Sequence, residues 1–395
     1  MAADGVNRRL AGRSLLRDRP WHLLWLAGVS VLWWTLFELI DVRLGNWYYV
    51  MSLGSRALRW TAGLLAFASV LPGIVETLEL VENARLWRSV RVRPLVWTPG
   101  KERAVLTLGL FSFALPLVWP DLFFPLTWGS FAFLLEPWNR RHARHSFLRD
   151  LEAGEAGPFC RTLLAGLVCG GLWESWNFWA RMKWVYTVPG FEGLKLFEMP
   201  LAGFLGFPPF AVECLVILRF MGGLRDRLSA AGAVRARWVA GLLGPPAVIG
   251  MFALADPVLV DSVYVPLARL DVLAPHLRGG LAAAGLASPE RFLRATRDPA
   301  AREAWAARAG VPVADLEAAR TRVALVVHHG LGLERAQELQ ALGIASLADL
   351  GRRPPEELAA ALAAQRPADP RNRFLERRAR VWTSGLDAAR DRAAR

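Results

Sequence analysis

The sequence is poor in the residue types that build soluble catalytic and metal centres. It has only three cysteines and six histidines in 395 residues. Cys160, Cys169 and Cys214 lie in or beside apolar segments, and their spacing fits neither a metal site nor a disulfide framework. No G-x-x-x-x-G-K-[ST], H-E-x-x-H, G-x-S-x-G or paired C-x-x-C pattern occurs. The sequence therefore predicts no metal site, no cofactor and no common soluble-enzyme chemistry.

Apolar and aromatic residues are abundant instead. Hydrophobic residues make up 54% of the chain, and nearly all of its 18 tryptophans precede residue 240. Tryptophan collects at the headgroup level of membranes, because its ring is apolar but carries one N–H donor. The net charge of +13 fits the excess of arginine and lysine in cytoplasmic loops of membrane proteins. A membrane protein is therefore favoured over a nucleic-acid-binding protein.

Several segments approach the roughly 20 apolar residues that a membrane-spanning helix needs. The predicted spans are residues 21–40, 58–81, 104–119, 122–136, 161–180, 196–221 and 238–258. The first follows five arginines and lacks a small-residue cleavage site, which favours a signal anchor over a removed signal peptide. The third and fourth spans are short and separated only by Trp-Pro-Asp, so six spans are the main alternative to seven. The basic loops predict a multi-pass protein of the plasma (inner) membrane with a cytoplasmic N-terminus.

A repeat of 137 residues runs through this region. Identical residues recur at that offset in the pairs Trp47 and Trp184, Tyr49 and Tyr186, Phe67 and Phe204, Pro72 and Pro209, Glu76 and Glu213, and Pro120 and Pro257. Glu38 and Glu174 correspond if one residue is inserted. The pattern predicts duplicated three-helix units, about 21–121 and 158–258, with one linking span between them. Membrane repeats of this kind often form a binding site at their interface.

Ionisable residues within membrane helices are costly and usually face an interior, a cavity or a partner. The candidate catalytic acids are Glu38, Glu76, Glu174 and Glu213. The candidate ligand-binding residues are Asn177, which shares a helix face with Glu174, and the span-end aromatics Trp47, Tyr49, Trp184 and Tyr186. The alternative is structural: the glutamates hydrogen-bond near span ends, and the aromatic residues anchor the interface.

The 3+1+3 arrangement, with W-x-Y after an acidic helix end and a proline-bearing helix next, resembles the small membrane lycopene cyclases. The resemblance covers residues 20–265 and implies acid-catalysed cyclisation by a buried carboxylic acid, without redox chemistry. That family carries a Pro-x-Glu-Glu run at the start of a membrane helix. Here Pro200 is followed by Leu201, Ala202 and Gly203, so the acids of that run are missing.

The composition changes after residue 265. We predict a basic N-terminus at 1–20, a membrane domain at 21–265, a linker at 266–286, a helical domain at 287–365 and a basic tail at 366–395. Within residues 323–362, an apolar helix ends at Gly330-Leu331-Gly332 and a second helix follows. This pattern resembles a bacterial helix-hairpin-helix domain of unknown function. The resemblance implies a phosphate-binding hairpin at Gly330, Leu331 and Gly332, whereas protein contact is the competing role.

The sequence thus predicts an all-α protein, with a polytopic membrane helix bundle followed by a small soluble helix-hairpin-helix domain. We expect it to bind a membrane lipid or apolar small molecule between its repeats, and a protein partner through residues 287–365. One alternative is a cofactor-free isomerase or cyclase that acts on an isoprenoid by acid catalysis, so enzymatic activity stays open. Another, less favoured, is a membrane tether that binds nucleic acid through the hairpin.

Overall fold

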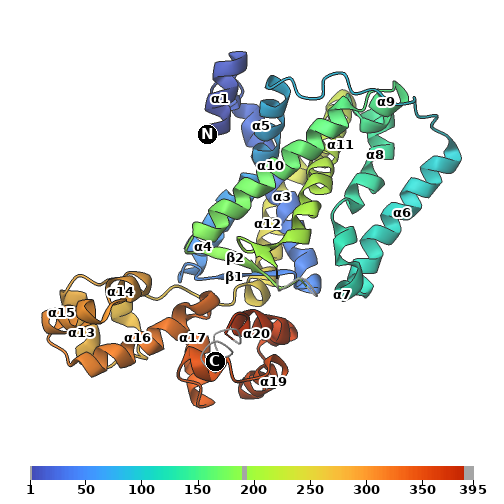
Figure 1. Cartoon of the computed structure of the whole chain (residues 1–395). Helices are drawn as coiled ribbons and strands as arrows, with labels where there is room; N and C mark the ends of the chain where they lie inside the picture. The colour runs from blue at the N-terminus through green and yellow to red at the C-terminus, as the bar shows by residue number, and fades with distance from the viewer. Residues whose placement is uncertain (1, 189–193, 387–395) are drawn as a thin grey trace. The chain divides into compact units, whose positions relative to one another are not determined.

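The computed structural model describes residues 2–188 and 194–386, and these are mostly helical (Figure 1). The described chain divides into two compact units. Unit 1 comprises residues 2–46, 60–178 and 194–255, and unit 2 comprises residues 47–59, 179–188 and 256–386. Unit 2 therefore combines the C-terminal region with two short segments that each follow a long helix.

Unit 1 is a helical bundle. Its elements, in chain order, are α1 (Ala2–Ala11), α2 (Leu15–Asp18), α3 (Pro20–Leu44), most of α4 (Arg56–Ala68), α5 (Val70–Asn83), α6 (Pro99–Val118), α7 (Pro120–Phe123), the 3-10 helix η1 (Phe124–Thr127), α8 (Ser130–His142), α9 (Phe147–Glu152), α10 (Gly157–Trp179), the short strands β3 (Lys195–Leu196) and β4 (Met199–Pro200), η2 (Leu201–Gly206), α11 (Phe207–Ala230) and most of α12 (Val234–Leu259). Figure 1 shows α6 and α8 side by side, connected through α7.

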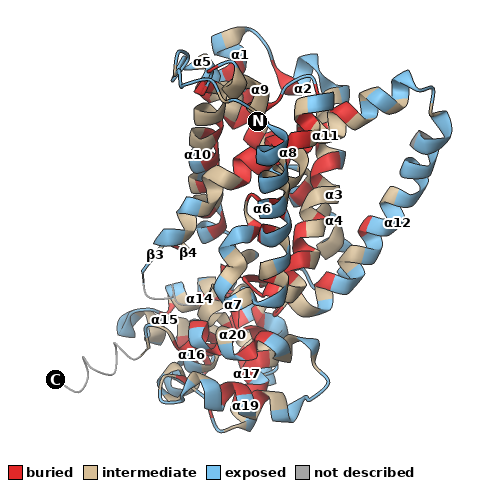
Figure 2. Cartoon of the chain, turned by 90° about the vertical axis from the view of Figure 1, so that its right-hand side faces the viewer, coloured by how far each residue is buried: buried red, intermediate tan, exposed pale blue. Residues whose placement is uncertain are grey.

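Within the described residues, four helical segments are long and apolar enough to cross a membrane. They are Pro20–Leu44, Arg56–Asn83, Leu201–Ala230 and Val234–Leu259. They coincide with four of the predicted spans and agree with a membrane protein, but they are fewer than the seven predicted. The last of them, α12, is largely exposed in Figure 2, as a helix that faces lipid would be.

The other three predicted spans form helices that fall short of this standard. α6 begins with a charged turn that contains Lys101, Glu102 and Arg103. The span predicted at 122–136 is broken, because η1 occupies its first part and Gly129 adopts a left-handed φ of 112° before α8 begins. Apolar composition alone does not reveal this break, which glycine permits at a φ that other residues avoid.

Two glycines bring α10 and α11 into close contact. A Cβ atom added at Gly166 would lie 2.4 Å from the carbonyl oxygen of Phe207, and one added at Gly170 would lie 2.2 Å from the Phe207 ring. Such G-x-x-x-G spacing is typical of membrane helices that pack closely, because association there depends on van der Waals contact. The sequence contains this pattern at Gly166 and Gly170, but the predicted spans rest on apolar length alone.

The two W-x-Y segments pair with each other in unit 2. Strands β1 (Trp47–Val50) and β2 (Lys183–Tyr186) are antiparallel, and the register places Trp47 opposite Tyr186 and Tyr49 opposite Trp184. The other edge of β1 is also covered, because residues 260–263 form isolated parallel bridges to it. The ribbon therefore leaves neither edge of β1 open to pairing with another chain.

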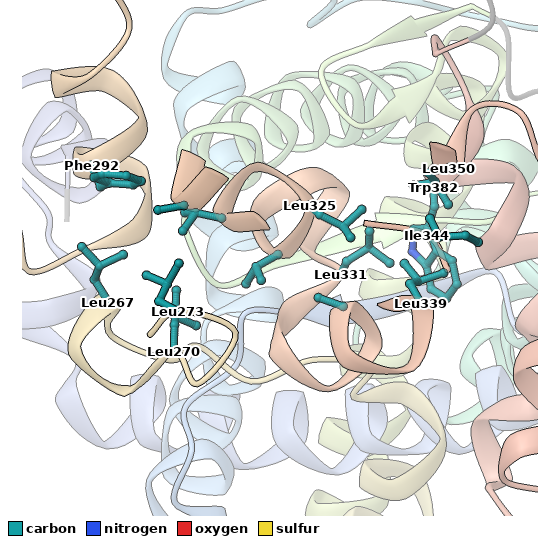
Figure 3. Close-up of a cluster of buried hydrophobic side chains, with 14 of the residues drawn as sticks. Leu267, Leu270, Leu273, Phe292, Leu325, Leu331, Leu339, Ile344, Leu350 and Trp382 are labelled. Carbon is teal, nitrogen blue, oxygen red and sulfur yellow. The ribbon is translucent and has the colours of Figure 1, made fainter. Parts of the chain in front are cut away.

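The rest of unit 2 is helical. Its elements are η3 (Leu267–Arg269), α13 (Pro275–Ala283), α14 (Pro289–Ala295), α15 (Pro299–Ala309), α16 (Val313–Val327), η4 (His328–Gly330), α17 (Gly332–Ala341), α18 (Leu347–Leu350), α19 (Pro355–Gln365), η5 (Pro370–Phe374) and α20 (Leu375–Thr383). One apolar core extends from Leu267 and Phe292 through Leu331 to Trp382 (Figure 3). Residues 370–383, placed by the sequence analysis in a tail, form η5 and α20 and pack into this core.

The predicted hairpin is a tight turn between α16 and α17. Gly330 and Gly332 have left-handed φ angles of 72° and 78°, and both are buried together with Leu331. A Cβ atom on Gly330 would lie 2.4 Å from Cβ of Val50, and one on Gly332 would lie 2.6 Å from Cβ of Ser262. The hairpin therefore packs against β1 and the segment beside it.

We predict that Gly330→Ala destabilises unit 2 more than Gly343→Ala. Gly343 also has a left-handed φ, of 78°, but faces open space, so alanine there incurs only the backbone penalty of about 1 kcal/mol. At Gly330 the overlap with Val50 should add about 1–3 kcal/mol. Thermal unfolding of the full chain in detergent measures both effects. Equal losses for the two variants would contradict the packing of the hairpin against β1.

Candidate functional site

Glu213 is a structural cap of α8. Its side chain is fully buried, and its two carboxylate oxygens accept hydrogen bonds from the N–H groups of Gly129 (3.0 Å) and Phe131 (2.7 Å). These N–H groups lie at the N-terminus of α8, where backbone donors lack partners and the helix dipole favours a negative charge. This arrangement accounts for a buried acid without a catalytic role.

Glu76, its counterpart in the predicted repeat, holds the N-terminal helix. The amide nitrogen of Asn7 on α1 donates to the Glu76 carboxylate (2.9 Å) and to its backbone carbonyl oxygen (3.0 Å). Asp4 on the same helix accepts from the Ser14 hydroxyl and the Leu16 N–H. Burial alone would raise the pKa of Asp4, but these hydrogen bonds outweigh it and hold the pKa below its usual value. Glu76 therefore secures α1 against α5.

Glu38 lies among aromatic rings. It is buried on α3, and the indole N–H of Trp34 donates to its carboxylate at 2.8 Å. The Trp34 ring packs against Phe67 and Phe210, with ring centroids 6.2 Å and 5.8 Å away. Further ring contacts link Phe37 to the same cluster, through Phe210 among others. The Glu38 carboxyl group is thus hydrogen-bonded to a tryptophan whose ring belongs to an aromatic cluster.

Glu174 and Asn177 are buried together on one face of α10. The predicted aromatic residues lie elsewhere: Trp47, Tyr49, Trp184 and Tyr186 are all in the β1–β2 ribbon of unit 2, where the Trp184 N–H donates to the Tyr186 hydroxyl at 2.8 Å. The four glutamates and Asn177 belong to unit 1. The structure thus assigns the predicted site residues to two different units.

A buried ionic network occupies unit 2, centred on Asp261. Its carboxylate accepts from Arg378 at 2.7 Å and lies 3.5 Å from the Arg335 guanidinium. Its backbone carbonyl accepts from Arg371 at 2.9 Å, and its N–H donates to the carbonyl of Tyr49 at 2.9 Å. Asp261, Arg335 and Arg378 are each at most 1% exposed. Burying a charge costs solvation free energy. Each of these charges offsets that cost by pairing with a group of opposite charge.

Beside this network lies an open groove of about 580 Å³. Its charged lining consists of the carboxylates of Asp256, Asp261, Glu334 and Asp369 and the guanidinium groups of Arg59, Arg366 and Arg371. All belong to unit 2. The groove cannot be recognised in the sequence, because its residues come from four separate regions of the chain that only the fold brings together.

Ion pairs set the charge state of the groove. Burial alone would raise the pKa of Glu334, but hydrogen bonds and charge from Arg371 and Arg366 hold it below its usual value. Burial would lower the pKa of Arg371, yet Asp369 and Glu334 raise it. Both groups stay ionised at neutral pH. Within the described residues, no group of three or more His, Cys, Asp or Glu side chains could hold a metal ion.

We predict that Glu213→Ala destabilises unit 1 by about 2–3 kcal/mol, because the N–H groups of Gly129 and Phe131 lose their acceptor in a buried site. Glu213→Gln should lose less, since its amide oxygen still accepts one of the two hydrogen bonds. Glu82→Ala, on the exposed surface of α5, is the matched control. Unfolding of the full chain in detergent ranks the stabilities of these variants. A Glu213→Ala variant as stable as the wild type would refute the capping role.

Asp261→Asn should destabilise unit 2 by about 3–5 kcal/mol, because Arg378 loses its buried counter-charge. The double variant Asp261→Asn/Arg378→Met should recover part of that loss by removing the unpaired charge. Asp315→Asn, which is half-exposed, controls for the substitution itself. Hydrogen exchange of the β1 amides and of α20 reports the local effect. If the double variant were as unstable as the single one, the ionic origin of the effect would be wrong.

Comparison with known proteins identifies only the C-terminal region. Residues 273–382 match the family model for a domain of unknown function, DUF4332. Neither curated proteins nor solved structures give a match to the chain. The matched region includes α13 to α19 and nearly all of α20, and therefore covers the groove residues from Glu334 onward. The chain thus joins a region similar to DUF4332 to helices that are long and apolar enough to cross a membrane.

Proposed function

We propose that the protein binds a membrane lipid or another apolar molecule in unit 1, beside Glu38 and Glu174. The observation that carries the proposal is the burial of these two acids in helices of a membrane protein, where an ionisable group is costly. Glu38 and Glu174 are buried on α3 and α10, the long helices that lead into the two W-x-Y strands. We assign to them the contact with a polar group on an otherwise apolar ligand.

The surroundings of Glu38 favour an extended hydrocarbon or polyene ligand. Its hydrogen-bond donor Trp34 packs against the rings of Phe67 and Phe210, and aromatic surface offers large apolar contact area at little conformational cost. Asn177, beside Glu174, adds both a donor and an acceptor. A ligand with a single hydroxyl or carbonyl group and a long apolar body matches this combination.

The order of elements supports the proposed internal repeat. Each half contains a long helix (α3 or α10), a four-residue strand (β1 or β2), a glutamate-bearing helix (α5 or α11) and another long helix (α6 or α12). The antiparallel register relates the two W-x-Y motifs by an approximate two-fold axis. Repeated membrane units commonly place a ligand site between them. We further propose that the N-terminus is cytoplasmic and that the membrane is the plasma (inner) membrane, as the basic loops indicate.

A second candidate function is acid-catalysed chemistry on an isoprenoid. It is favoured by the Trp34–Glu38 hydrogen bond within the ring cluster, because a carboxylic acid could protonate a double bond and aromatic faces stabilise the resulting cation. Nucleic-acid binding is less favoured, since Gly330, Leu331 and Gly332 are buried in unit 2. For residues 287–365 we propose contact with a protein partner.

The isosteric variants Glu38→Gln and Glu174→Gln test lipid binding. We expect each to reduce the lipid that co-purifies with the full chain in mild detergent by about tenfold, the effect of losing one charge-assisted hydrogen bond. Glu82→Gln, on the exposed surface of unit 1, should retain it. Mass spectrometry of extracted lipids provides the measurement. Lipid recovery equal to wild type in both variants would refute the proposal.

The same chains expressed in a lycopene-accumulating bacterium separate binding from catalysis. A new cyclic pigment that depends on Glu38 or Glu174 would establish the enzyme. Unchanged pigment together with variant-sensitive lipid retention would support binding alone.

A further inference from the structure

The groove of unit 2 presents matched charges of both signs. Arg59 holds Asp256 through two hydrogen bonds of 2.7 Å, and Arg371 holds Asp369 in the same bidentate way, from Nε to Oδ1 and from Nη2 to Oδ2. Arg366 pairs with Glu334, and these two side chains are the most exposed, at 49% and 42%. The Asp261 carboxylate is already paired with the buried guanidinium group of Arg378. Besides Asp261, the lining thus contains three carboxylates and three guanidinium groups, of which Glu334 and Arg366 are the well exposed ones.

Such a lining suits a zwitterion better than a simple ion. A bare phosphate would face carboxylates, and a bare cation would face arginines, so like-charge contact would oppose either one. A ligand with an ammonium and a phosphate group can place each beside its opposite charge at the exposed Glu334–Arg366 pair. Arginine binds phosphate oxygens with good geometry, and carboxylates accept N–H donors.

The residues of the lining also favour a primary amine over a quaternary ammonium group. Recognition of a quaternary ammonium such as choline normally uses a cage of aromatic rings. Among the described residues that line the groove there is no phenylalanine, tyrosine or tryptophan. The available carboxylates require a group that donates hydrogen bonds. A primary amine meets that requirement and choline does not.

The position of the groove in the chain indicates that the zwitterion is a lipid headgroup. Arg59 lies near the start of the candidate span Arg56–Asn83, and Asp256 lies near the end of Val234–Leu259. The ends of membrane-spanning helices lie at headgroup level. The remaining wall is apolar, with Pro257, Val260 and Val263 on one side, and can contact the glycerol and upper acyl region.

We propose that this groove binds the headgroup of an aminophospholipid, with its primary ammonium at Glu334 and its phosphate at Arg366. The inference concerns unit 2 alone and goes beyond the proposed function of unit 1. Glu38→Gln and Glu174→Gln should leave this headgroup preference unchanged, so the two proposals can fail separately.

Native mass spectrometry of the full chain, released from nanodiscs, tests the inference. We expect retention of phosphatidylethanolamine about tenfold above that of phosphatidylcholine or phosphatidylglycerol with the same acyl chains. Equal retention of phosphatidylcholine would exclude an N–H requirement, and preferred phosphatidylglycerol would indicate an anion site. Either result would overturn the proposal. Soluble glycerophosphoethanolamine should compete weakly, and competition as strong as by the lipid itself would overturn the lipid assignment.

Two variants locate the binding. Ala368→Trp fills the groove from its exposed wall and should abolish the preference, whereas Ala360→Trp, on the exposed surface of α19 away from the groove, should retain it. Glu334→Gln removes one accessible carboxylate without adding bulk and should reduce the preference several-fold, with Glu357→Gln as control. Thermal unfolding of each variant identifies loss of the fold. Folded Ala368→Trp and Glu334→Gln chains with wild-type preference would refute the site.

Discussion

The buried carboxylate of Asp261 is the interaction on which unit 2 depends. Its side chain holds Arg378 from α20, its carbonyl holds Arg371 from η5, and its N–H completes the edge of β1. One residue therefore joins the strand ribbon, the end of a membrane helix and the C-terminal helices. The apolar core can form around it only when these charges are satisfied together, since an unpaired buried ion costs several kcal/mol. This requirement links the position of the groove to the stability of the fold.

The need to satisfy buried polar groups also divides the acids of unit 1. Glu213 supplies what the N-terminus of α8 lacks, and Glu76 supplies an acceptor to Asn7 on α1. In an apolar environment these hydrogen bonds are favourable, because without them a buried N–H donor would have no acceptor. Two residues related by the 137-residue offset thus have different partners. The offset alone therefore does not determine how a carboxyl group is used.

The sequence predicted those features that depend on local pattern. The helical class, the segment 21–40 and the turn at Gly330-Leu331-Gly332 all follow from apolar runs and glycine placement, and the structure contains α3 and the turn where expected. The break at Gly129 was missed, because a short apolar stretch gives no sign of a left-handed residue within it. The groove could not be predicted at all. Arg59 pairs with Asp256 and Arg371 pairs with Glu334. Both pairs depend on tertiary contacts that periodicity does not encode.

The segment that follows α12 differs from the segment 137 residues before it. The 137-residue offset relates Pro120 to Pro257 and therefore places Phe124 at the position of Asp261. In the first half this position begins η1, a turn that leads directly into the next helix. In the second half the chain continues alongside β1, where Asp261 can meet Arg378. Asp261 supplies the acceptor for Arg378 and Arg371, whereas the position 137 residues earlier holds the apolar Phe124. The hairpin glycines have a corresponding constraint, because Gly332 must admit Ser262 from this same segment. Unit 2 thus depends on both W-x-Y strands and on the stretch of chain that follows α12.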